Sequence, residues 1–181
     1  GVLAFGFVAS WLFGREYSDG TVKDLLSLPT SRTRILNAKF IIYIIWCLAL
    51  VVSNLIIGLL IGTILQLPST KINVLYPLLT DYFITTILTI LIGVPIPFFA
   101  LLGKGYLAPL GFVALTLVLA QVIAAIGYGS YFPWSIPGLY SGAGGAFKNL
   151  LDKYSYLILI LTCIAGYIAT VIYWKNADQT K

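Results

Sequence analysis

One uninterrupted apolar run decides the class of this chain. Residues 40–67 include no charged side chain, and a helix of that length reaches about 40 Å, enough to cross a hydrocarbon core of about 30 Å with some tilt. Only 9% of the chain is charged and 60% is hydrophobic, whereas a soluble domain is about 25% charged. Because too few polar side chains remain to cover a globular surface, the sequence predicts an integral membrane protein.

Four further apolar segments accompany this run, at residues 1–13, 79–102, 106–126 and 156–174. Their lengths indicate helices rather than the short alternating strands of a membrane barrel. The first has 13 residues, or about 20 Å of helix, which is too short to span. We therefore expect an all-α, polytopic fold in one transmembrane domain over residues 1–181, with five spans of which the first is truncated and six in the full protein.

The basic residues predict the orientation. If the spans alternate, eight lysines and arginines fall on one side of the membrane and three on the other. The richer side is cytoplasmic by the positive-inside rule. The loop at residues 14–38 and the C-terminus are thus predicted to be cytoplasmic, and the loop at residues 127–155 is predicted to face outward.

The cytoplasmic loop contains an amphipathic segment. On a helical wheel, residues 18–28 divide into an apolar and a polar arc, as in an amphipathic helix of about three turns. The apolar arc holds Thr21, Val22, Leu25, Leu26 and Leu28, and the polar arc holds Asp19, Gly20, Lys23, Asp24 and Ser27. Ser18 or Asp19 is expected to cap this helix, and Pro29 to end it. It either lies on the lipid headgroups or docks a soluble partner.

The stretch "REYSDGTVKDLLSLPTSRTRILNAKF" resembles the first cytoplasmic loop of type-2 ABC exporter permeases, in the bacitracin and lantibiotic-type branch. The resemblance is carried by an acidic residue before a Gly-Thr pair, a Leu-Pro helix end, a basic turn and a lysine at the next span. These positions are Glu16, Gly20, Thr21, Leu28, Pro29, Arg32 and Lys39. The tail "YWKNADQTK" is also similar to those of such permeases. With the span pattern, the resemblance covers essentially the whole chain.

The resemblance implies a permease subunit of an ATP-driven exporter in a bacterial-type cell membrane. Such a subunit dimerises with a second permease subunit and binds a cytoplasmic ATPase through a coupling helix. The implied coupling residues are Glu16, Asp19, Gly20, Thr21, Val22, Leu25, Leu26, Leu28, Pro29 and Arg32. Three partners stay open for Glu16, namely Arg15, Arg32 or an ATPase residue. The expected cargo is an amphipathic compound such as a peptide antibiotic.

The chain offers little of its own for catalysis. It has no histidine, and "LLGKGYL" lacks the upstream glycine and the hydroxyl residue of a P-loop. We expect no enzyme activity, cofactor or metal here, with ATP and Mg on the partner ATPase. Cys47 and Cys163 are interpreted as isolated packing residues within spans.

Two other functions are compatible with such a chain. An ATP-independent secondary transporter or channel would need charged groups near the midplane of the membrane, and the sequence has almost none. A non-transporting immunity or sensor subunit that binds a peptide antibiotic would share the same fold, and the sequence leaves it open.

Within the spans, a few residues are candidates for the path or for helix contacts. Ser53 and Asn54 lie deep in the second span, where interhelical hydrogen bonds are the usual role. Gly58 and Gly62 form a GxxxG pattern that permits close helix approach. Asp81 follows Tyr76 and Pro77 closely, so it is predicted to cap a helix at the outer interface.

The outer loop is rich in aromatic residues, proline and glycine and poor in charge. Such a segment either lies irregularly among the headgroups or dips back into the membrane where protein covers it. The resemblance favours a re-entrant segment that helps to form an outer lid. Its candidate residues are Tyr131, Phe132, Pro133, Trp134 and Pro137.

Overall fold

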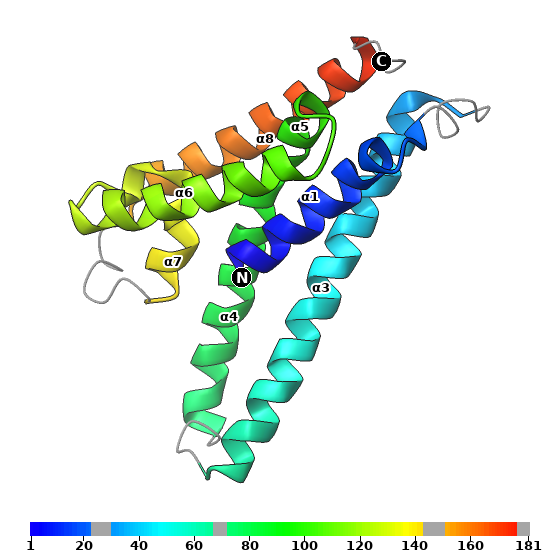
Figure 1. Ribbon diagram of the computed structural model, residues 1–181. Helices are drawn as coiled ribbons and strands as arrows, with labels where there is room; N and C mark the ends of the chain where they lie inside the picture. Colours follow the sequence, from blue (N-terminus) through cyan, green and yellow to red (C-terminus); the bar gives the residue numbers. More distant parts are fainter. Residues whose placement is uncertain (23–29, 67–71, 143–150, 177–181) are drawn as a thin grey trace.

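The computed structural model describes residues 1–22, 30–66, 72–142 and 151–176, and within them every regular element is helical. The α-helices in these residues are α1 (Val2–Ser18), α3 (Arg32–Ile64), α4 (Ile72–Gly93), α5 (Ile96–Leu102), α6 (Leu107–Ala125), α7 (Ile136–Tyr140) and α8 (Lys153–Asn176) (Figure 1). Two 3-10 turns, η2 (Gly129–Tyr131) and η3 (Pro133–Ser135), precede α7. The predicted all-α polytopic fold is confirmed.

Four stretches of the described chain are long and apolar enough to cross a membrane, namely Arg32–Ile64, Leu75–Leu102, Leu107–Ala125 and Lys153–Asn176. They match four of the five predicted spans. The remaining helix, α1, has 17 residues, or about 25 Å, slightly less than the ~30 Å of a hydrocarbon core. Its crossing stays a prediction.

Helix α1 lies at the centre of the molecule, where it packs against α3, α5 and α6. Helix α8 packs against α5, α4 and α3. Helices α3 and α4 form a long hairpin whose far end extends beyond the other helices (Figure 1). The C-terminal end of α8 and the start of α3 lie at the same end of the molecule, opposite the tip of this hairpin.

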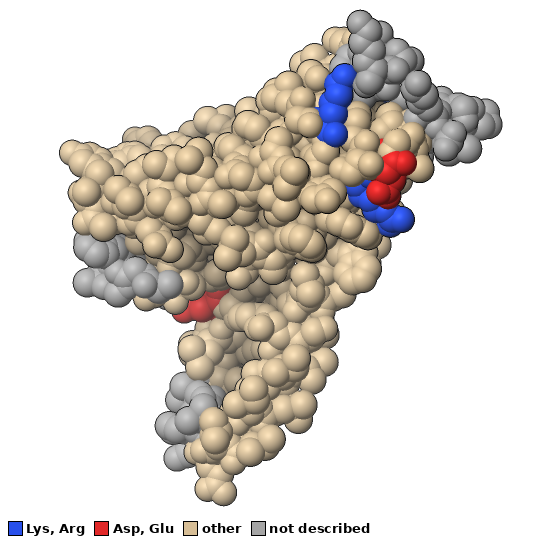
Figure 2. Space-filling model, in the orientation of Figure 1, with Lys and Arg blue, Asp and Glu red and all other residues tan. Residues whose placement is uncertain are grey.

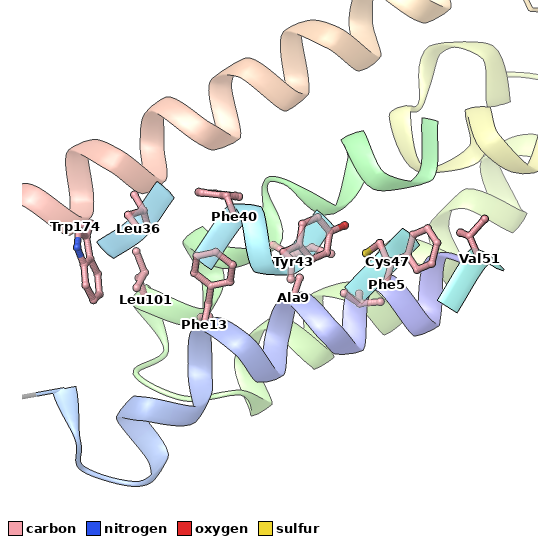
Figure 3. Close-up of a cluster of buried hydrophobic side chains, with 13 residues drawn as sticks. Phe5, Ala9, Phe13, Leu36, Phe40, Tyr43, Cys47, Val51, Leu101 and Trp174 are labelled. Atoms are coloured by element: carbon pink, nitrogen blue, oxygen red, sulfur yellow. The ribbon is translucent and has the colours of Figure 1, made fainter. Parts of the chain in front are cut away.

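The main hydrophobic core forms where α1 meets α3 and α5 (Figure 3). The rings of Phe13 and Phe40 lie 5.0 Å apart between centroids. Tyr43 is fully buried, and its hydroxyl donates to the Ile90 carbonyl of α4 at 3.2 Å. Cys47 is buried in this core and Cys163 is partly exposed, and both are free thiols, as predicted.

Small residues bring α1 unusually close to its neighbours. Gly6, Ser10 and Gly14 are spaced by four, so they share one face of the helix. A Cβ on Gly6 would lie 2.7 Å from Val113 Cγ1 of α6, and one on Gly14 would lie 2.6 Å from the Gly105 carbonyl carbon. Such spacing lets helix backbones approach closely. By contrast, a Cβ on Gly58 would meet nothing within 4 Å.

The third predicted span differs from expectation at both ends. Pro77 and Asp81 both lie inside α4, so Asp81 does not cap a helix and that prediction was wrong. A proline is tolerated there because the carbonyl that it frees can find other partners in a membrane helix. The helix breaks instead at Val94 and Pro95, between α4 and α5. Helix α8 meets this break closely, because a Cβ on Gly166 would lie 2.6 Å from Pro95 Cα.

The segment after α6 folds back onto the helices. Its short elements pack against α4, α6 and α8, and Ile136 and Leu139 are almost fully buried. Pro133 and Pro137 stand in the first turns of η3 and α7, where a missing N–H costs no helical hydrogen bond. This close packing is compatible with a re-entrant segment, and its depth in the membrane stays a prediction.

Candidate functional site

The loop that follows α1 starts at a sharp helix stop. The Gly20 N–H donates to the Tyr17 carbonyl at 3.4 Å and the Thr21 N–H donates to the Glu16 carbonyl at 3.0 Å. Gly20 has φ +71°, in the left-handed region that favours glycine. This pair of bonds around a left-handed residue is the Schellman motif, which satisfies the last carbonyls of a helix. The Gly-Thr pair therefore ends α1 and turns the chain into the loop.

This stop corrects the predicted limits of the amphipathic helix. Ser18 is the last residue of α1 and Asp19 is its C-cap, so neither caps a following helix. The left-handed Gly20 separates them from Val22, the next helical residue, which is only 5% exposed. The predicted positions Leu25, Leu26, Leu28 and Pro29 lie outside the described residues, so a docking helix there stays a prediction.

A buried ion pair joins the two helices that flank the loop. The Lys39 ammonium of α3 donates to Glu16 Oε2 of α1, and only 8% of the Lys39 side chain and 24% of the Glu16 side chain are exposed. Lys39 Nζ also lies 5.7 Å from the ring centroids of both Phe13 and Trp174. Aromatic faces attract cations at such distances. The ammonium is thus held by one carboxylate and two rings.

The partner of Glu16 is therefore neither Arg15 nor Arg32. Arg15 Nε donates to Asp19 Oδ2 at 3.1 Å, in a pair whose side chains are about half exposed. Exposed pairs of this kind are worth about 0–1 kcal/mol. Breaking a buried pair costs far more, because the remaining charge is left without water or counterion. Glu16–Lys39 therefore adds a strong polar contact to the packing of Phe13 on Phe40 between α1 and α3.

Helix α8 is tied to the same place. The indole N–H of Trp174, which is 1% exposed, donates to the Arg32 carbonyl at 2.9 Å. The Arg32 guanidinium in turn donates to the Lys175 carbonyl at 3.2 Å. We call this arrangement of Phe13, Glu16, Arg32, Lys39 and Trp174 the three-helix junction. Figure 2 shows charged side chains gathered at this end of the visible face.

The structure also places the candidate residues of the second span. Asn54 Oδ1 lies 3.3 Å from the Tyr82 hydroxyl of α4, which donates as well to the Val51 carbonyl at 2.9 Å. Asn54 therefore belongs to a contact between α3 and α4. The Ser53 hydroxyl instead donates to the Ala49 carbonyl of its own helix at 2.8 Å. Sequence reasoning missed Lys39 as the partner of Glu16, although the resemblance had marked both positions.

Replacing Gly20 with alanine is expected to lower the free energy of unfolding by about 1–2 kcal/mol, since a Cβ disfavours the left-handed conformation. Among the described residues, no atom lies within 4 Å of the new Cβ, so the expected cost comes from the backbone. Thermal unfolding of the detergent-solubilised protein measures the change. Gly111→Ala is the matched control, because Gly111 is an open position inside α6. Equal losses in the two variants would contradict the helix stop.

Two comparisons with known proteins agree with one another. The family model described as "ABC-2 family transporter protein" matches residues 1–123. The chain is also 30% identical over 178 residues to the bacitracin transport permease protein BCRB of Bacillus licheniformis, an alignment that covers 98% of this chain and 85% of the relative. No solved structure matches.

Proposed function

This chain belongs to the ABC-2 family of transporter proteins, as a permease of the bacitracin type, and we propose that a separate cytoplasmic ATPase drives it through the segment between α1 and α3. As a member of this family, the chain is the membrane subunit of an ABC exporter. Such a subunit is a transport component rather than an enzyme. The observation that carries the proposal is the Glu16–Lys39 ion pair, which joins the two helices flanking that segment.

The three-helix junction supports a coupling role because the loop starts and ends on it. Residue 20 leaves α1 one turn after Glu16, and Arg32 begins α3 two turns before Lys39. A displacement of the intervening segment would act on both helices together. Trp174 and Arg32 would pass the same displacement to the end of α8. ATP binding would thus move three membrane helices through the three-helix junction.

The orientation is part of the same proposal. The bond between Arg32 and the Lys175 carbonyl holds the last turn of α8 beside the loop after α1. Both segments therefore belong to one side of the membrane, and the positive-inside rule makes that side cytoplasmic. This supports a cytoplasmic C-terminus and a cytoplasmic site for the ATPase. A second permease subunit, identical or related, would complete the exporter, with the path at their interface.

The cargo that we propose is an amphipathic peptide antibiotic. The relative is by name a bacitracin transport permease, and the face predicted to be outward is aromatic and poor in charge. In operation, ATP binding on the partner would close the ATPase pair and pull the loop. The path would then open outward and release the compound on that side.

Leu25→Asp tests the coupling segment. A charge placed in the apolar arc is expected to abolish co-purification with the ATPase and to reduce bacitracin resistance to the level of cells without the exporter, because an unpaired carboxylate in an apolar interface costs several kcal/mol. Co-purification and growth inhibition by bacitracin are the two measurements. Ser27→Asp adds the same charge to the polar arc and is expected to leave both unchanged. An intact complex and intact resistance in Leu25→Asp would refute the coupling role.

A further inference from the structure

A groove runs along α8, between that helix and the neighbouring helices α5 and α6. Its larger part has a volume of about 560 Å³ and is also lined by the segment after α6. A second part, of about 480 Å³, continues along α8 to Asn176, and the two parts share Phe98 and Ala169. No described lining residue belongs to α1 or α3. The groove exists because α6 and α8 both pack on α5 but hardly contact one another.

The larger part of the groove is apolar, although two threonines line it. The Thr116 and Thr162 hydroxyls each donate to a carbonyl of their own helix, at 3.0 and 2.8 Å, so neither proton is left for a ligand. The rings of Phe99 and Phe112, which also line it, are stacked with centroids 3.7 Å apart. Lipid tails are as apolar as such side chains. This part of the groove therefore suits a hydrocarbon chain.

The smaller part of the groove ends among polar and basic groups. Tyr173 and Asn176 line it, and both side chains can donate hydrogen bonds. Next to Asn176, Lys175 is exposed, and the Arg32 guanidinium donates to the Lys175 carbonyl at 3.2 Å. The described acidic side chains at this end of the molecule are paired with other basic residues. This end of the groove therefore attracts an anion.

The length and volume of the groove fit one lipid chain. Thr162 and Asn176 are 14 residues apart, or about 21 Å of helix, and one leaflet of the hydrocarbon core is about 15 Å thick. A chain that enters beside Asn176 can thus follow the groove through its whole leaflet. A further helix of that length, about 10 Å across, would fill roughly 1,600 Å³, more than both parts of the groove together.

We infer that this groove binds one anionic phospholipid, with an acyl chain between α6 and α8 and the phosphate beside Lys175 and Asn176. The inference goes beyond the proposed transport function. On the proposed orientation, the lipid belongs to the cytoplasmic leaflet, where basic groups near the surface attract anionic lipids. The acyl chain would fill the space between two helices that hardly touch, and it would cover the helix break at Pro95, which lines the groove.

Photo-crosslinking tests the site. The complete exporter is purified in detergent, stripped of bound lipid and given one equivalent of phosphatidylglycerol per permease chain. A benzophenone amino acid replaces either Leu115, which lines the groove, or Val118, which is 63% exposed and lies outside the lining. Lipid capture is expected to be several-fold greater at position 115. Equal capture at the two positions would overturn the inference. Cross-linking of position 115 to a second permease chain would also overturn it, because another copy would then occupy the groove.

Two matched substitutions test the acyl chain. Phosphatidylglycerol is expected to raise the unfolding temperature of the lipid-stripped exporter more than phosphatidylcholine with the same chains. Ala169→Trp places a ring where the two parts of the groove meet and is expected to abolish that difference. Ala114→Trp adds the same ring at an exposed position of α6 outside the lining and is expected to keep it. Cooperative unfolding of both variants without lipid shows that they are folded. An unchanged difference in Ala169→Trp would overturn the inference.

Lys175→Gln tests the headgroup. This variant is expected to weaken phosphatidylglycerol binding about fivefold, the usual contribution of one basic residue near a membrane surface, and to leave phosphatidylcholine binding unchanged. Lipid titration followed by native mass spectrometry measures both affinities. Equal affinities for the two lipids in the unmodified exporter would overturn the selection of an anionic headgroup.

Discussion

Replacing Glu16 with alanine is expected to lower the free energy of unfolding by about 3–5 kcal/mol, the usual cost of leaving one member of a buried ion pair alone. Lys39 would keep the rings of Phe13 and Trp174 but lose its counterion. Its ammonium is too deeply placed to regain full hydration, since 8% of the side chain is exposed. Thermal unfolding of the detergent-solubilised chain measures the loss.

Two controls separate burial from charge. Asp19→Ala removes a half-exposed pair of the same kind and is expected to cost less than about 1 kcal/mol. Glu16→Leu combined with Lys39→Leu removes both charges and should recover most of the stability, because apolar replacement of a buried pair is often neutral or favourable. Equal losses of unfolding free energy in Glu16→Ala and Asp19→Ala would show that the Glu16–Lys39 pair does not hold α1 to α3.

Replacing Gly14 with valine is expected to cost about 2–3 kcal/mol, near the upper range for overpacking. A Cβ there would lie 2.6 Å from the backbone of Gly105 and Tyr106, in the turn between α5 and α6. Backbone in a short turn cannot rotate aside as a side chain can, so α1 itself would have to move. The same thermal measurement applies.

The matched control for Gly14 is Gly58→Val, since Gly58 lies inside α3 and its Cβ would meet nothing within 4 Å. That variant is expected to change the free energy of unfolding by no more than about 0.5 kcal/mol in the isolated chain, as is usual for exposed positions. A loss at Gly58 as large as the loss at Gly14 would show that close approach within the chain does not explain the cost.

The spanning helices could be predicted from the sequence because the hydrocarbon core of a membrane contains no water to bond backbone polar groups. Every backbone polar group must be paired within the segment, so a long apolar run permits little except a helix. The break at Pro95 lies inside one predicted span, and its physical cause is that proline lacks the N–H that a continuing helix needs. The prediction for Asp81 was wrong because it placed Pro77 before the start of a helix, whereas α4 runs through Pro77.

The candidate site was harder to predict from the sequence, because its contacts join distant parts of the chain. Glu16 and Lys39 are 23 residues apart, and only the packing of α1 on α3 makes them neighbours. Gly20 was placed inside a helix because its polarity fitted the wheel, while its left-handed backbone depends on the cap geometry.

The break between α4 and α5 has a mechanical consequence. The stretch Leu75–Leu102 counts as one crossing by length and composition, yet its helical hydrogen bonding is interrupted at Val94 and Pro95. Helix α4 is hydrogen-bonded to α3 through Tyr43 and Tyr82. Helix α5 packs on α1, α6 and α8. The two pieces need not tilt as one rod, and only a glycine at position 166 of α8 lets that helix reach the point where they meet, since a Cβ there would lie 2.6 Å from Pro95 Cα.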